Sequence, residues 1–216
     1  MIFIKYKHLI NLAILISGRG SNMYAILSAI KLGKIQNLKP SIVISNNPNA
    51  AGLKIASEKF GVATKTLIDC GHKGWAYDRR LIPVLEEYAV NKEEGAICLA
   101  GFNRILSPEF VCRFKMRIMN IHPALLPSFQ GLHAQKQALE YGVKVSGCTV
   151  HFVDEGVDTG PIILQRTVPV LDSDTEELLA ERILKVEHEL YPEALDLFSK
   201  GNIMIKGRRV YIKKTQ

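Results

Sequence analysis

Asn120 and His122, two residues apart, have side chains that could stabilise an oxyanion and move a proton. They follow a short strand-like run at residues 117–119, and alternate side chains of a strand share one face. Pro123 keeps His122 extended and has no amide to continue a ladder. We therefore expect the pair side by side at a strand end, where open α/β sheets bind ligands. An amide donates to a developing oxyanion, and an imidazole titrates near neutral pH. The alternative is a strand that merely ends in polar residues.

The longer string NIHPALLPSFQG, which Leu132 and His133 follow directly, resembles the signature of the formyltetrahydrofolate-dependent formyltransferases. Ala124 stands where that family usually has serine. The resemblance runs from about residue 11 to about residue 200, and it is closest to members that formylate phosphoribosylglycinamide in purine synthesis. It implies that Asp158, in HFVDEGVDTGPI, orients the histidine and completes a catalytic set: Asn120, His122 and Asp158.

A glycine-containing stretch at residues 17–22 lies between a predicted strand at 11–16 and a predicted helix at 22–32. Backbone N–H groups and the helix dipole at such a junction hold phosphate. Met23 replaces the third glycine of a dinucleotide fingerprint, and the strand at 40–45 ends without an acid, so a phosphate monoester is favoured over NAD. A plain tight turn is the alternative. The resemblance implies phosphoribosylglycinamide contacts at Gly20, Ser21, Asn22 and Glu187.

Two further segments resemble folate-binding parts of the family. AGFNRILSP resembles the segment that lines the pterin pocket, and HFVDEGVDTGPI resembles the folate-binding loop. A basic residue that the family often has before AYDR corresponds to Lys73. Taken alone, these segments would be an ordinary strand–helix loop and a solvated hairpin turn. The folate contacts implied by the resemblance are Lys73, Asn103, Arg104, Ile105, Leu106, Asn120, Asp154, Glu155, Gly156, Val157 and Asp158.

Strand and helix patterns alternate along the chain. They predict one doubly wound, Rossmann-like α/β domain with a mostly parallel sheet that is mixed at one edge. We expect an N-terminal extension at residues 1–10 and a formyltransferase domain at 11–216, with the nucleotide in its N-terminal half and the folate in its C-terminal half. Four details of this expectation can be checked: a helix at 76–90 kinked by Pro83, a helix at 131–141, a helix capped by Ser173 and interrupted by Pro192, and two strands within 202–212.

Composition limits the partners. The net charge is +7, but Lys and Arg are dispersed except for a C-terminal cluster of Lys206, Arg208, Arg209, Lys213 and Lys214. That cluster lacks the aromatic–basic interleaving typical of single-strand binding, so we expect a solvated tail and no nucleic-acid partner. The four cysteines form no C-x-x-C pair, and no stretch has the length of a membrane span or the features of a signal peptide. We therefore expect a cytoplasmic protein without a membrane partner. No HxH or HExxH spacing suggests a metal.

The resemblance implies direct formyl transfer from 10-formyltetrahydrofolate, as co-substrate, to the amine of phosphoribosylglycinamide, by a monomer or homodimer. Formyltetrahydrofolate hydrolases and sugar-nucleotide formyltransferases are the alternatives with similar chemistry. Methionyl-tRNA formyltransferases have a further RNA-binding domain, for which this chain is too short. A nucleotide- or RNA-binding module would explain the glycine loop and the charge, but not Asn120, His122 and Asp158.

Overall fold

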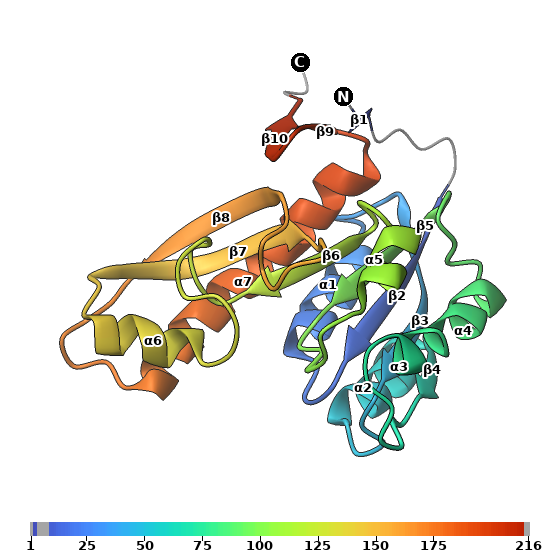
Figure 1. Ribbon diagram of the computed structural model, residues 1–216, viewed down its shortest axis with the longest axis horizontal. Helices are drawn as coiled ribbons and strands as arrows, with labels where there is room; N and C mark the ends of the chain where they lie inside the picture. The colour runs from blue at the N-terminus through green and yellow to red at the C-terminus, as the bar shows by residue number, and fades with distance from the viewer. Residues whose placement is uncertain (1, 4–8, 214–216) are drawn as a thin grey trace.

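The computed structural model describes residues 2–3 and 9–213. Seven strands form one sheet in the order β4-β3-β2-β5-β6-β7-β8 (Figure 1). Neighbours from β4 to β6 pair parallel, whereas β7 is antiparallel to both β6 and β8. The predicted fold class, including the mixed edge, is confirmed. The strands are β2 (Ile10–Ile16), β3 (Leu38–Ser45), β4 (Ala63–Thr66), β5 (Gly95–Leu99), β6 (Ile118–His122), β7 (Val145–Phe152) and β8 (Ile162–Pro169).

Helices cover both faces of this sheet. Side chains on one face pack with α1 (Ser21–Lys31), α2 (Ala51–Phe60), α6 (Ala134–Tyr141) and α7 (Glu176–Ser199). The other face packs with α3 (Trp75–Asp78), α4 (Leu81–Glu87) and α5 (Pro108–Arg113). In β2, Leu12 and Ile14 belong to the first core and Ala13 and Leu15 to the second, because successive strand side chains point to opposite faces. A strand segment buried on both sides has to be apolar, as residues 12–16 of this strand are.

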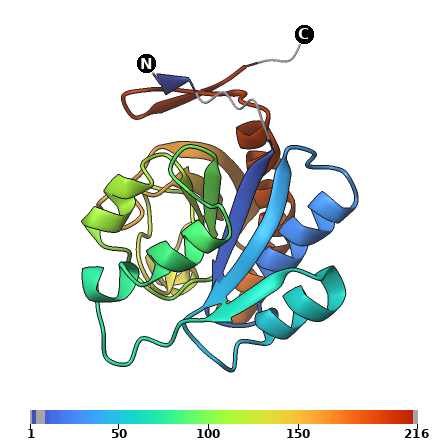
Figure 2. The ribbon, with the colours of Figure 1, turned by 90° about the vertical axis from the view of Figure 1, so that its right-hand side faces the viewer.

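A second, three-stranded sheet lies beyond the end of α7. It contains β1 (Ile2–Phe3), β9 (Ile203–Lys206) and β10 (Arg209–Ile212), all antiparallel (Figure 2). The two strands predicted within residues 202–212 are therefore confirmed. Of the predicted extension at 1–10, Ile10 lies in β2 and residues 2–3 form β1, while residues 1 and 4–8 lie outside the described part of the chain, as does Lys214.

The predicted helix at residues 76–90 is wrong, because the structure divides it into α3 and α4. Pro83 is the third residue of α4. The first N–H groups of a helix have no carbonyl partner within it, so proline at this position costs no hydrogen bond. Pro83 therefore lies in the first turn of α4 and does not kink the middle of a longer helix.

Two other helix predictions need correction. The long final helix begins at Glu176 with Thr175 as its cap, not Ser173, and it continues through Pro192 to Ser199. Tyr191, Ala194 and Leu195 are fully buried on both sides of that proline, so packing against the sheet compensates for the lost hydrogen bond. The helix predicted at 131–141 begins only at Ala134.

Gly147 of β7 has no room for a side chain. A Cβ there would lie 2.0 Å from the Arg166 carbonyl oxygen, which belongs to backbone, whereas a Cβ at Gly18 would have nothing within 4 Å. We expect Gly147→Ala to lower the free energy of unfolding by about 1–3 kcal/mol. The control Gly18→Ala should change it by about 0.5 kcal/mol at most. Urea denaturation measures both, and equal stabilities would contradict the packing of β7 against β8.

Candidate active site

Strand β6 brings Asn120 and His122 to the carboxyl ends of the parallel strands. On its other side, antiparallel β7 places His151 directly opposite Asn120. Because residues 120 and 122 share one face of the strand, both side chains reach the same carboxylate, that of Asp158. The juxtaposition expected from the spacing of the two residues is therefore present.

The Asp158 carboxylate is the centre of this group. Its Oδ2 lies 3.2 Å from Nδ1 of His122 and accepts a hydrogen bond from the Gly131 amide at 2.9 Å. Its Oδ1 lies 3.4 Å from Nδ2 of Asn120 and 3.6 Å from Nε2 of His151. Asp158 has a φ of 53°, in the left-handed region that non-glycine residues rarely adopt. The surrounding contacts therefore hold a backbone conformation that is unfavourable by itself.

The charge states of Asp158 and His122 follow from these surroundings. Burial alone would raise the pKa of Asp158, but the nearby His151 ring, the Gly131 amide and the charge of His122 together lower it below its usual range. For His122 burial dominates and lowers the pKa, while Asp158 and the Phe129 carbonyl oppose the shift. The free site thus pairs an ionised carboxylate with a largely neutral imidazole.

Both ring nitrogens of His122 face oxygen acceptors. Nε2 lies 2.7 Å from the Phe129 carbonyl oxygen, and Nδ1 lies 3.2 Å from Asp158. A neutral imidazole has a single N–H and can donate to only one of them, whereas the imidazolium donates to both. The geometry can therefore stabilise the imidazolium that forms when His122 takes up a proton.

His151 is a site residue that the sequence analysis missed. Its ring is buried, with Nδ1 2.9 Å from the Phe152 carbonyl oxygen and Nε2 3.2 Å from Nδ2 of Asn120. A neutral ring that donates from Nδ1 accepts at Nε2, which orients the Asn120 amide. The 3.4 Å contact of that amide with Asp158 is long, so a developing oxyanion can compete for the same hydrogen. Only the β6–β7 register shows that His151 faces Asn120.

The glycine loop and Glu187 form a second polar centre. Gly20 precedes α1 in a left-handed conformation, and a Cβ there would lie 3.0 Å from the Cα of Gly52. Ser21 and Asn22 open the helix, and Nδ2 of Asn22 donates to Glu187 at 2.7 Å. Oδ1 of Asn22 is buried and has no hydrogen-bond partner among the described residues. Burial raises the pKa of Glu187, which the Asn22 hydrogen bond offsets in part.

Ser17 joins the loops that follow β2, β3 and β5. Its amide donates to the Gly101 carbonyl at 2.8 Å, and its hydroxyl donates to Asn46 at 2.6 Å. The same hydroxyl accepts from the Asn103 amide at 2.8 Å. The backbone of Asn103 is thereby fixed at the carboxyl end of the sheet. Of its predicted folate-binding neighbours, Ile105 is exposed and Leu106 is buried.

The Arg104 side chain connects this segment to the loop that carries Lys73. Its guanidinium donates to Asp69 at 3.0 Å and to the His72 carbonyl at 2.8 Å, and it lies 3.8 Å from the centre of the Tyr77 ring. Lys73 itself is exposed. Hydrogen bonds from Arg104 therefore connect its segment to the loop that contains Lys73. The folate contacts of Arg104 and Lys73 stay predictions.

The loop between β7 and β8 closes on itself. Asp154 accepts hydrogen bonds from the Thr159 hydroxyl at 2.5 Å and from the Gly156 amide at 3.2 Å, so its carboxylate stabilises the turn. Glu155, Gly156 and Val157 are exposed. The predicted folate contacts of residues 154–157 stay predictions.

Two absences hold for the described part of the chain. Within residues 2–3 and 9–213, no three His, Cys, Asp or Glu side chains group as a metal site would require. No helix in the same ranges is long and apolar enough to cross a membrane.

The fold is a Rossmann-like sheet, and an asparagine and a histidine at one strand end both contact an aspartate. This combination is the one expected for a formyltransferase. Residues 10–195 match the family model described as formyl transferase, and the chain belongs to this family. The resemblance read from the sequence is confirmed.

Individual relatives agree with this membership. The phosphoribosylglycinamide formyltransferase of Escherichia coli (strain K12) is 44% identical over 94% of this chain and 93% of its own length. A glycinamide ribonucleotide transformylase 1 structure from Symbiobacterium toebii superposes with a TM-score of 0.90 at 47% identity, covering 97% of this chain and 96% of that one. The trifunctional purine biosynthetic protein adenosine-3 of Drosophila melanogaster is 46% identical over 89% of this chain, which spans only 14% of that protein's length.

The contact between His122 and Asp158 can be tested without a ligand. Because the carboxylate favours the charged imidazole, Asp158→Asn should lower the pKa of His122, measured by NMR titration of the ring. Asp172→Asn removes an exposed carboxylate that pairs with Lys144 and should leave that pKa unchanged. An unchanged or raised pKa in Asp158→Asn would contradict the proposed coupling.

Proposed function

We propose that this chain transfers the formyl group of 10-formyltetrahydrofolate to the amine of phosphoribosylglycinamide. The products are formylglycinamide ribonucleotide and tetrahydrofolate, in purine biosynthesis. One observation carries the proposal: two polar centres lie at the carboxyl ends of β6 and β2, which belong to the same parallel part of the sheet. One contains Asn120, His122 and Asp158, and the other contains the Asn22–Glu187 pair beside the glycine loop. Membership of the formyl transferase family and the similarity to the E. coli enzyme support it.

The two centres suit the two substrates. Backbone N–H groups at the start of α1 suit a phosphate, and Gly20, Ser21, Asn22 and Glu187 would hold phosphoribosylglycinamide. The folate would bind along the segments that contain Lys73, residues 103–106 and residues 154–158, with its formyl group next to Asn120. Both partners are small molecules. We propose that the protein acts in the cytoplasm, without a nucleic-acid or membrane partner, as a monomer or homodimer.

The reaction follows from the charge of each group. The amine attacks the formyl carbon, and the carbonyl oxygen becomes an oxyanion that accepts a hydrogen bond from Asn120. Nε2 of His122 leaves the Phe129 carbonyl and takes up the proton of the attacking nitrogen, so that the ring becomes an imidazolium beside that charge. The same nitrogen then passes the proton to N10 of the folate. The bond between N10 and the formyl carbon then breaks. Asp158 stays ionised throughout and holds the imidazole by Nδ1.

This scheme needs neither a covalent enzyme intermediate nor a metal. When one cleft holds both substrates, proximity supplies a large part of the rate. The remaining barrier lies in the charge that develops on the carbonyl oxygen and on N10, which the Asn120 amide and the His122 ring contact directly.

The mechanism predicts a specific kinetic pattern. His122→Ala and Asp158→Asn should each lower kcat about a hundredfold or more, because both act on charge that appears only in the transition state. The dissociation constants of the two substrates should change little. Steady-state kinetics and ligand titration measure these quantities, with Asp172→Asn as the matched carboxylate control. A variant with normal kcat and a raised KM would contradict the assigned roles.

A second experiment separates transfer from hydrolysis, which needs the same three side chains. A transferase excludes water from the attack path until the amine is bound. We therefore expect rapid loss of formyltetrahydrofolate only when phosphoribosylglycinamide is present, with the formyl group recovered on the glycinamide nitrogen. Rapid formate release from the folate alone would replace the proposal with a hydrolase. Transfer only to the amine of a sugar nucleotide would replace the proposal with a sugar-nucleotide formyltransferase.

A further inference from the structure

We propose that Arg208, at the tip of the C-terminal hairpin, is a positioning residue that holds the Asp158 carboxylate against His122. Its guanidinium donates a hydrogen bond to the main-chain carbonyl of Thr159 at 2.5 Å, directly after Asp158 in the chain. The two residues are 49 positions apart. The family match ends at residue 195, so Arg208 belongs to a part of the chain that the match does not include.

Apart from the contacts of the Asp158 carboxylate, the described main chain of this loop has few hydrogen bonds to other elements. The Asp158 carbonyl accepts from Gln130 at 3.1 Å, and the Thr159 carbonyl accepts from Arg208. The remaining contacts of Thr159 and Asp154 are within the loop itself. Gln130 and Arg208 therefore hold two successive main-chain carbonyls from outside.

These tethers matter because of the backbone conformation. Asp158 has a φ of 53°, and such a residue persists only where its surroundings determine its conformation. A rotation about the N–Cα bond of Asp158 would let this backbone relax, and it would displace the chain that follows, including the Thr159 carbonyl. The carboxylate would then move away from Nδ1 of His122, from which it lies 3.2 Å. The hydrogen bond from Arg208 to the Thr159 carbonyl opposes that rotation.

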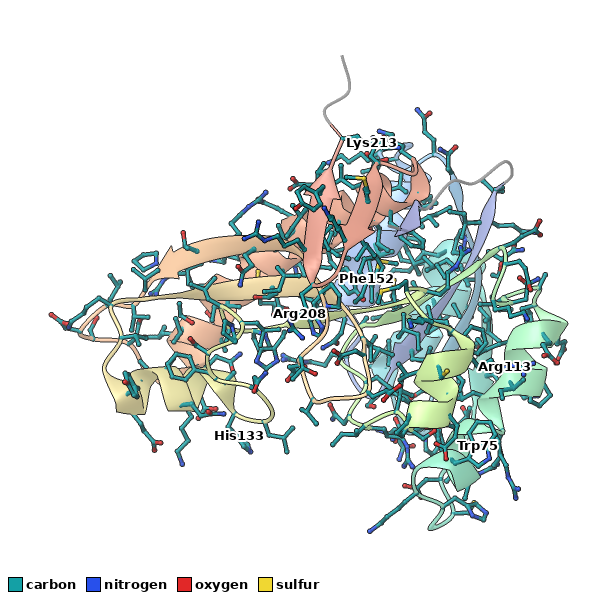
Figure 3. All side chains as sticks on the ribbon, turned by 45° about the horizontal axis from the view of Figure 1, so that its top comes forward. Trp75, Arg113, His133, Phe152, Arg208 and Lys213 are labelled. Carbon is teal, nitrogen blue, oxygen red and sulfur yellow. The ribbon has the colours of Figure 1, made fainter. Side chains whose placement is uncertain are left out.

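The hairpin can act as a fixed support. Ile203 and Ile205 of β9 are buried, and β9 is paired on both sides, by β1 and by β10. Gly207 makes the turn with a φ of 60°, and Arg208 follows it. Figure 3 shows Arg208 at the tip of this hairpin, next to the loop between β7 and β8. Arg208 is exposed, as expected for the basic cluster, but its guanidinium also contacts this loop.

Arg209 provides a matched comparison. It has the same charge, it is the next residue in the same hairpin, and it is exposed as Arg208 is. Its backbone pairs with Lys206 across the turn. Neither side chain forms an ion pair with a carboxylate in the part of the chain that the structure describes. A difference between the two residues therefore reports the hydrogen bond to Thr159 and not the charge of the hairpin.

The test compares Arg208→Met, Arg208→Lys and Arg209→Met in the full chain, and its kinetic part rests on the proposed formyl transfer. Arg208→Met removes the donor, and we expect kcat to fall about five- to tenfold. The KM for phosphoribosylglycinamide should not change. Arg208→Lys retains a cationic donor on a long stem and should restore most of kcat. Arg209→Met should behave as the wild type. Thermal unfolding of each variant measures any loss of stability.

A second readout needs no substrate. A less firmly held Asp158 should lower the pKa of His122 in Arg208→Met, whereas the simple loss of a positive charge would raise it. NMR titration of His122 gives the sign. The positioning role is overturned if Arg208→Met has the wild-type kcat and His122 pKa, if the two methionine variants behave alike, or if the pKa rises. A wild-type protein that transfers no formyl group would refute the proposed function, while the titration would still test Arg208.

Discussion

One partly buried carboxylate, that of Asp158, accounts for the arrangement of this candidate active site. Asp158 has polar neighbours in two strands and a loop: His122 and Asn120 in β6, His151 in β7, and the Gly131 amide. Burial of an ionised group costs free energy unless several donors compensate it. The carboxylate can therefore occupy this position only where the elements that supply these donors come together. Asn120 and His122, which we propose as the oxyanion donor and the proton carrier, are consequently aligned by the fold itself.

The mixed edge of the sheet makes this possible. Because β7 runs antiparallel to β6, Phe152 at its end lies opposite Met119, near the start of β6. The following loop has to return along β6 for Asp158 to reach His122. Gly160 permits that return, since a Cβ there would lie 1.8 Å from the Phe152 carbonyl oxygen. A side chain at this position would push the loop away from the end of β7.

Much of this arrangement could be predicted from local sequence, and the exceptions share one cause. The period of apolar residues gave the strands, and the spacing of Asn120 and His122 gave their common face. His151 and Arg208 were missed because their roles depend on partners 31 and 49 residues away. The sequence pattern was also wrong at two prolines whose effect depends on tertiary packing. The pattern interrupted the final helix at Pro192, but α7 continues through it because its neighbours are buried. The pattern placed Pro83 in the middle of a helix, but this residue lies in the first turn of α4.

Two carboxyl groups of the chain are driven in opposite directions by their surroundings. Asp158 has several donors and a lowered pKa, whereas Glu187 is more deeply buried, has the single Asn22 donor, and has a raised pKa. Surroundings that shift the pKa values of two carboxyl groups in opposite directions suit them to different chemical roles. We propose that Asp158 acts as a fixed anion that polarises His122. Glu187 is under-supplied with donors, so a ligand that donates a hydrogen bond to it stabilises its carboxylate form, and binding at the Asn22 end becomes coupled to loss of a proton there.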